Sequence, residues 1–147
     1  QLVLDLGADA VVDSRSESLG EEVMAAAGGH VDLVLEMAGG SSFDQLLGTL
    51  RPFGRMIVVG IATREQNEVR TGRLLKNSIS VSGFWLMHLL ARPDLARDSS
   101  DRVFGATARG ELKAVVGGTF GLSEARQVHR DIAGRKTVGK LLLDPKR

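Results

Sequence analysis

Glycines stand at the carboxyl ends of two short apolar segments, which end at Gly39-Gly40 and at Gly60. In an open α/β sheet, ligands bind beyond the carboxyl ends of the parallel strands. A glycine there lacks the Cβ that would hold a ribose or a pyrophosphate away from the backbone. This spacing is typical of nucleotide binding, and it is equally typical of plain strand-to-helix turns.

The only tryptophan, Trp85, follows an alternating run at Ile79–Ser82. A single tryptophan is most often a core residue, but a position just past a strand end also suits the wall of a cofactor site. No residues with catalytic spacing accompany it. The sequence has no Gly-x-Gly-x-x-Gly, no Gly-x-Ser-x-Gly, no Ser–His–acid spacing and no tyrosine. Ser82 and His88 carry groups able to move protons, but nothing singles them out, so the catalytic residues stay unknown.

Composition excludes several classes of function. The chain has 147 residues, 43% of them hydrophobic, which is enough for a core of its own. A net charge of +1 argues against nucleic-acid binding through bulk charge. Without cysteine there is neither a disulfide nor a thiolate metal site, and the three histidines are scattered, so no metal is expected. No apolar run approaches the roughly 20 residues of a membrane span, and no signal segment is visible, so we expect a cytoplasmic protein.

The elements that must position these glycines alternate between strands and helices. Strands are expected at 10–13, 31–38, 55–61, 79–84, 115–120 and 137–143, with helices between them. The segments between the expected strands are long enough to hold a helix, which favours right-handed βαβ crossovers and a parallel sheet. Residues 31–38 are almost continuously apolar, which predicts a strand covered on both faces, whereas 79–84 alternates as an edge strand does. Ser18 and Glu21 predict a capping box at a helix start.

Four motifs, in order, carry a resemblance to a known family. Residues 6–13, 31–39, 50–60 and 137–143 resemble the medium-chain dehydrogenase/reductase superfamily. Within it, Gly83–Leu86 looks like the branch of quinone reductases and enoyl-thioester reductases. The resemblance implies an α/β fold: a partial doubly wound (Rossmann-like) parallel sheet lacking its first βαβ unit, plus C-terminal strands of the catalytic domain. It divides the chain into a partial dinucleotide-binding domain, 1–112, and a returning C-terminal segment, 113–147.

The same resemblance implies a function and a set of site residues. The parent enzyme would use NADPH, with NADH possible, to reduce a quinone or an activated carbon–carbon double bond of a small-molecule substrate. The implied cofactor contacts are Met37, Ala38, Gly39, Gly60, Ile61, Ala62, Phe84, Trp85, Leu86 and Lys140. The glycine-rich phosphate loop and the catalytic domain would lie upstream of Gln1, so the chain alone is expected to be inactive. Two alternatives stay open: part of a zinc-dependent alcohol dehydrogenase, and a non-catalytic binding or assembly module.

Strand order gives two further expectations. In the family the strand matching 79–84 is an edge that pairs with its twofold mate, so we expect a homodimer through this strand and neither nucleic acid nor membrane as a partner. A doubly wound sheet runs 3-2-1-4-5-6, which makes 10–13 strand 3 and 33–38 strand 4. Strands 1 and 2 are absent from the sequence. We therefore expect the inner edge of strand 4 to be closed by residues 10–13 or by another chain, because unpaired buried backbone groups are costly.

Overall fold

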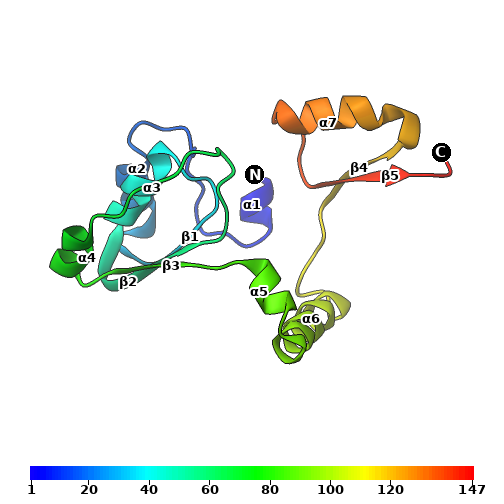
Figure 1. The fold of residues 1–147 in the computed structure, drawn as a ribbon. Coiled ribbons are helices and arrows are strands. Elements are labelled where there is room, and N and C mark those ends of the chain that lie inside the picture. Colours follow the sequence, from blue (N-terminus) through cyan, green and yellow to red (C-terminus); the bar gives the residue numbers. More distant parts are fainter. The chain divides into compact units, whose positions relative to one another are not determined.

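The structure is a computed structural model that describes residues 1–147, and it divides into two compact units, 1–87 and 88–147. The first unit holds α1 (Leu2–Asp5), α2 (Leu19–Ala27), β1 (Val31–Glu36), α3 (Ser41–Gly48), β2 (Leu50–Val58), α4 (Thr71–Asn77) and β3 (Ser80–Gly83) (Figure 1). α5 (Leu86–Leu90) spans the boundary. The second unit holds α6 (Pro93–Ala108), β4 (Val116–Gly121), the 3₁₀ turn η1 (Leu122–Glu124), α7 (Ala125–Ala133) and β5 (Lys140–Asp144).

Parallel pairing confirms the predicted α/β fold class. In the first unit the strand order is β1-β2-β3, with α3 and α4 as the crossovers. The helices pack on the sheet through one apolar cluster, whose buried members are Phe43, Leu47, Leu50, Met56 and Ile79. The register is what matters for the site, because Glu36 pairs with Val58 and Val58 pairs with Gly83. The last residues of the three strands therefore lie in one row.

The beginning of β2 is irregular. Val31 pairs with Leu50, but the next partners are Leu33 and Arg55, so residues 51–54 bulge out of the ladder. Pro52 lies within this bulge, where its missing N–H does no harm. Phe53 adopts a left-handed φ of 68°, which is rare for an aromatic residue. Pro52 and Gly54 therefore lie in the irregular first part of this strand.

The prediction that the first of these strands is covered on both faces is wrong. Leu33 is 55% exposed and Leu35 is 61% exposed, while Glu36 is buried. The strand has the composition of a central strand, but within this chain β1 has a neighbour on one side only.

The predicted strand at 10–13 is also absent. Residues 10–13 form no ladder, and β1 pairs only with β2, so the expected closure of the β1 edge by this segment is wrong. Residues 8–14 instead run as an irregular segment beside α2 and the end of β1, where they line a cleft. The physical reason is that an isolated four-residue strand has nothing to pair with once its own neighbours are missing.

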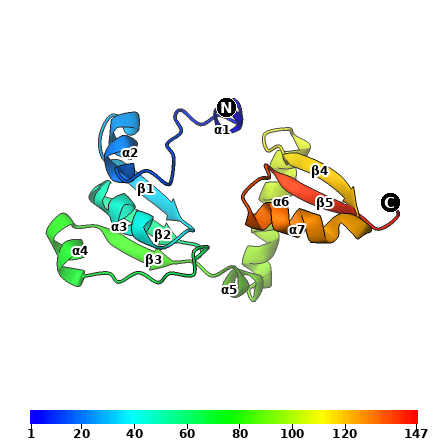
Figure 2. The same ribbon diagram turned by 90° about the horizontal axis from the view of Figure 1, so that it is seen from above.

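The second unit is a single crossover, β4–α7–β5, with the two strands parallel (Figure 2). Val128 on α7 is its one buried apolar residue. The strand bounds differ from expectation: β4 is Val116–Gly121 instead of 115–120, and β5 begins at Lys140 instead of 137. α6 begins at Pro93, which is a favourable first helical residue. None of the helices combines the length and the apolar character needed to cross a membrane. The division at 112/113 concerns functional domains of a longer protein and stays a proposal.

Candidate functional site

The carboxyl ends of β1, β2 and β3 bring three of the predicted segments to one edge of the sheet. The amide of Val59 donates to the carbonyl of Glu36 (2.8 Å), and the amide of Phe84 donates to the carbonyl of Val58 (2.9 Å). Residues 37–39 and 60–62 are therefore direct neighbours, and 84–86 leave the sheet beside them. The sequence-based placement of these nine residues at one sheet edge is correct, while their contact with a cofactor remains a prediction.

Glu36 organises the turn that follows β1. Its side chain is only 2% exposed, and its Oε1 accepts hydrogen bonds from the amides of Ala38 (2.8 Å) and Gly39 (2.7 Å). The other carboxylate oxygen, Oε2, is buried and has no hydrogen-bond partner. Sequence reasoning missed this residue. The available signal was an acidic residue that directly follows the apolar run Leu33–Leu35 at the end of the strand.

The loop after β2 is bonded to the same turn. The amides of Ala62 and Thr63 donate to the carbonyls of Met37 (3.0 Å) and Ala38 (2.9 Å), and the Thr63 hydroxyl also donates to the Ala38 carbonyl (2.8 Å). Asn67 completes the contact at Gly40: its Nδ2 donates to the Gly40 carbonyl (2.8 Å), and its Oδ1 accepts from the Gly40 amide (3.0 Å). Nothing in the local sequence marks Asn67, which stands in a polar loop.

The glycines at these strand ends have a role within the chain itself. Gly39 has φ 74°, and a Cβ on it would lie 2.7 Å from the backbone oxygen of Glu65. A Cβ on Gly60 would lie 3.2 Å from the carbonyl oxygen of Met37. Both glycines thus allow the turn and the loop to approach each other closely. Of the two roles that the sequence left open, the structure supports the turn; it leaves the nucleotide role as a prediction.

The backbone amides of this turn are all hydrogen-bonded within the chain, and the large side chains around the turn are apolar. The amides of Ala38, Gly39 and Gly40 all donate within the chain, so they are not free to bind a phosphate. Around them, large apolar side chains face solvent, namely Met37, Val59, Ile61, Phe84, Trp85 and Leu86. Trp85 is 65% exposed, so it is not a core residue of its unit. The arrangement suits van der Waals contact with a flat ring or a sugar.

Two hollows adjoin the strand ends. A cleft of about 620 Å³ is bounded by α2, residues 8–14 and the end of β1, including Met37 and Ala38. A smaller hollow of about 140 Å³ lies between the turn and the loop, against Gly39, Gly60 and Asn67. Glu36 lines both. The larger volume is within the range of small-molecule sites, and the smaller one is below it.

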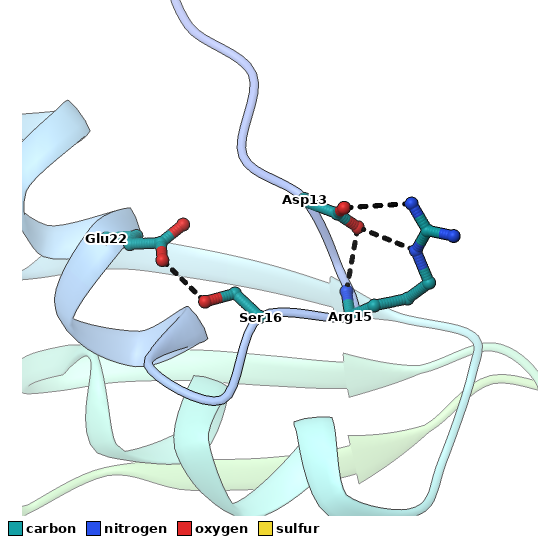
Figure 3. Close-up of polar contacts among 4 residues, drawn as sticks. All are labelled: Asp13, Arg15, Ser16 and Glu22. Atoms are coloured by element: carbon teal, nitrogen blue, oxygen red, sulfur yellow. Dashed lines mark hydrogen bonds and ion pairs between the residues drawn. The ribbon is translucent and has the colours of Figure 1, made fainter.

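A short polar network fixes the loop at the rim of the large cleft (Figure 3). The guanidinium of Arg15 donates to both carboxylate oxygens of Asp13 (3.1 and 2.9 Å), and the Arg15 amide donates as well (3.0 Å). These hydrogen bonds lower the pKa of Asp13 to about 2. The hydroxyls of Ser16 and Ser18 donate to Glu22 Oε1 (2.5 and 3.0 Å). Ser18 makes no side-chain cap bond, so the predicted capping box with Glu21 is wrong.

Lys140 lies in the other compact unit, at the start of β5, where its amide donates to the carbonyl of Val115 (2.7 Å). Its predicted proximity to a cofactor stays a prediction. For a metal ion, the donor set does not fit. The chain has no cysteine, and no three His, Asp or Glu side chains cluster as ligands.

Comparisons with known proteins agree on one family. The sequence profile described as zinc-binding dehydrogenase matches residues 6–143. A quinone oxidoreductase-like protein 2 homolog from Nematostella vectensis is 30% identical over 148 residues, covering 99% of this chain and 40% of the relative. A 2-haloacrylate reductase from a Burkholderia species is 28% identical over 143 residues, covering 95% of this chain and 43% of the relative.

Solved structures show the same fold. A mycobacterial protein complexed with NADPH superposes with a TM-score of 0.86 at 28% identity, over 98% of this chain and 45% of that one. A mycobacterial quinone oxidoreductase gives a TM-score of 0.82, also at 28% identity and with the same coverage. The chain thus spans about two fifths of the length of the curated relatives that it matches.

Proposed function

The chain belongs to the zinc-binding dehydrogenase family, and from this premise we propose that it is the cofactor-binding part of an NADPH-dependent oxidoreductase that reduces a quinone or an activated carbon–carbon double bond. The observation that carries the proposal is the row formed by Glu36, Val58 and Gly83. It places a bonded glycine turn and exposed apolar side chains at one edge of a parallel sheet, which is where such sheets bind ligands.

The residues present fit the nucleoside parts of the cofactor. We propose that Met37–Gly39 and Gly60–Ala62 contact the adenosine side, with Met37 and Ile61 offering exposed apolar surface. Phe84, Trp85 and Leu86 would form the wall on the nicotinamide side, and Lys140 is proposed as a further cofactor contact.

We propose that the phosphates are held outside the turn 37–40. The amides of residues 38–40 are already bonded within the chain, and a buried carboxylate, Glu36, lies directly behind them. Both features disfavour an anion at this turn. When bound, the cofactor supplies a hydride. The residues of this chain bind and orient it, and no residue here is assigned a proton-transfer role.

The class of substrate is proposed from the relatives. Those matched carry the names quinone oxidoreductase, 2-haloacrylate reductase and prostaglandin reductase-3. Quinones and double bonds conjugated to a carbonyl share an electron-poor carbon or oxygen that accepts a hydride, and the resulting enolate-like charge needs stabilisation by polar groups. A cytoplasmic location and a homodimer through β3 belong to the same proposal. The outer edge of β3 is unpaired, which leaves it available for a second copy.

The test uses the complete protein that carries this chain. We expect saturable NADPH binding by calorimetry, and NADPH-dependent loss of absorbance at the nicotinamide band with a quinone or an enone as acceptor. A non-catalytic module would show neither signal. Zinc-dependent alcohol oxidation would instead be lost on chelation and restored by zinc. Either outcome would refute the proposed reduction.

A further inference from the structure

We infer that Asn67 and Glu36 are positioning residues of the nucleotide site, which hold the turn 37–40 and the loop 60–67 together as one preset surface. The inference rests on the proposed function, because these two segments are the ones proposed to contact the adenosine side of the cofactor. It adds two residues whose side chains are hydrogen-bonded to the backbone of the turn.

Asn67 binds Gly40 as a neighbouring strand would. Its carboxamide offers one donor and one acceptor, and they meet the carbonyl (2.8 Å) and the amide (3.0 Å) of the same residue. Aspartate lacks the donor. Serine would have to donate and accept through a single oxygen atom, which does not reproduce the separate donor and acceptor atoms of the carboxamide. The half-buried Asn67 also lines the small hollow between the two segments. Asparagine is therefore specifically suited to this position.

Glu36 holds the same turn from the β1 side. One carboxylate oxygen accepts from two consecutive amides, those of Ala38 (2.8 Å) and Gly39 (2.7 Å). Glutamine retains an oxygen that can take this position, whereas alanine leaves both amides without an acceptor. Leaving buried amides unbonded favours any conformation that exposes them to water. Glu36 and Asn67 together bond all three consecutive amides of the turn.

Because the turn and the loop are already bonded together, this binding surface does not have to become ordered when a ligand binds. Segments that are ordered only on binding reduce the apparent affinity in proportion to the fraction of molecules in the competent state. The close approach of the Glu65 backbone to Gly39 shows how little space separates the two segments when the surface is closed. If a substitution lowered the closed fraction to about one tenth, the Kd for a nucleotide would rise about tenfold.

The first test measures closure directly, by amide hydrogen exchange on this chain. In Asn67→Asp we expect the amides of Gly40, Ala62 and Thr63 to exchange about fivefold faster or more, with the β1–β2 ladder unchanged. Asn77→Asp makes the same chemical change at the only other asparagine, which is exposed, and should have no such effect. Unchanged exchange in Asn67→Asp would overturn the inference. So would faster exchange throughout the ladder in both Asn67→Asp and Asn67→Ser, because Asn67 would then stabilise the whole unit.

The second test measures NADPH binding to the complete protein. We expect Kd to rise about tenfold in Asn67→Asp and in Glu36→Ala, and to stay within about twofold of the wild type in Glu36→Gln. The kcat at saturating NADPH should change little, because the closed surface is restored by bound cofactor. A Kd unchanged in Asn67→Asp and Glu36→Ala would overturn the inference while leaving the proposed function intact. A wild-type protein that binds no NADPH would instead refute the proposed function, and the exchange data would still report on closure of the turn.

Discussion

Gly20 of α2 lies directly against Gln45 of α3. The Gly20 amide donates to the side-chain oxygen of Gln45 (3.1 Å), and a Cβ on Gly20 would lie 3.1 Å from the Gln45 backbone oxygen. Because that oxygen belongs to a helix, it has little freedom to move away. This contact seats α2 on α3 and so sets one wall of the large cleft, which α2 lines with Leu19 and Val23.

A pair of glycine substitutions tests this contact. Gly72, in α4, has open space where a Cβ would be, so Gly72→Ala should stabilise the chain by about 0.5–1 kcal/mol through helix propensity alone. Gly20→Ala gains the same propensity but meets Gln45, so it should be about 1–3 kcal/mol less stable than Gly72→Ala. Urea unfolding of both variants measures the difference. Equal stabilisation would show that α2 shifts without cost.

The Asp13–Arg15 pair gives a pH-dependent signal. Hydrogen bonds from Arg15 lower the pKa of Asp13 to about 2 in the folded chain. A lowered pKa stabilises the folded state above the pKa of the unfolded chain, and this contribution is lost as the pH falls through about 2. An NMR titration of the Asp13 side chain should give this midpoint. In Arg15→Ala the midpoint should return towards the ordinary aspartate value, and an unshifted midpoint in the wild type would exclude the pairing in solution.

The 147-residue chain by itself should bind NADPH weakly. Its turn at 38–40 has no free amide for a phosphate, and the nucleoside contacts alone bury too little surface for tight binding. Calorimetry on the isolated chain should give a Kd weaker than about 1 μM, that is, weaker than roughly 8 kcal/mol of binding free energy. Tighter binding would mean that phosphate-binding groups exist within these residues.

Trp85→Ala in the complete protein should lower turnover more than stability. Trp85 is largely exposed in its unit, so its removal should change the free energy of unfolding by no more than about 0.5 kcal/mol. The loss of a nicotinamide wall should instead reduce kcat/KM. A variant that is strongly destabilised, yet as active per folded molecule as the wild type, would assign Trp85 to packing.

Val81→Pro should separate the proposed homodimer into monomers. The Phe84 amide points to β2, and amides alternate along a strand, so the Val81 amide faces away from β2. Proline at this position removes a donor from the outer edge and leaves the β2–β3 ladder intact. Light scattering measures the change. Ser82→Pro is the matched control, because it should break the ladder itself and destabilise the unit. A dimer that survives Val81→Pro would place the interface elsewhere.

Local patterns predicted the elements that depend on local chemistry. α2 ends before Gly28, whose φ of 71° closes the helix as expected of glycine, and β1 begins at Val31. The alignment of the carboxyl ends of β1, β2 and β3 could also be predicted, because helical crossovers keep consecutive strands parallel. The failures among the strands involve neighbours that the chain does not pair with them. Residues 10–13 have strand composition but no neighbour, and the exposure of Leu33 and Leu35 reflects the same lack.

The side-chain hydrogen bonds at and near the site could not be predicted from the local sequence. Asn67 is 27 residues from Gly40, and its role depends on two loops meeting after the sheet has formed. Ser18 has the residue type of a cap, but Glu22 competes for its hydroxyl one turn further along the helix. In both cases the sequence offers several equivalent partners, and only the packed arrangement selects one.

Each ladder in the structure joins strands that are consecutive in the chain, with a single crossover between them. Each pairing has to close the loop that contains its crossover helix before the ladder forms, so these ladders form more slowly than a β-hairpin. During synthesis, β1 and β2 can pair as soon as β2 has left the ribosome, and β3 can add to them before the second unit is made. Within the first unit the strands can therefore pair in the order in which they are translated, because the β1–β2 pair provides the free edge to which β3 adds.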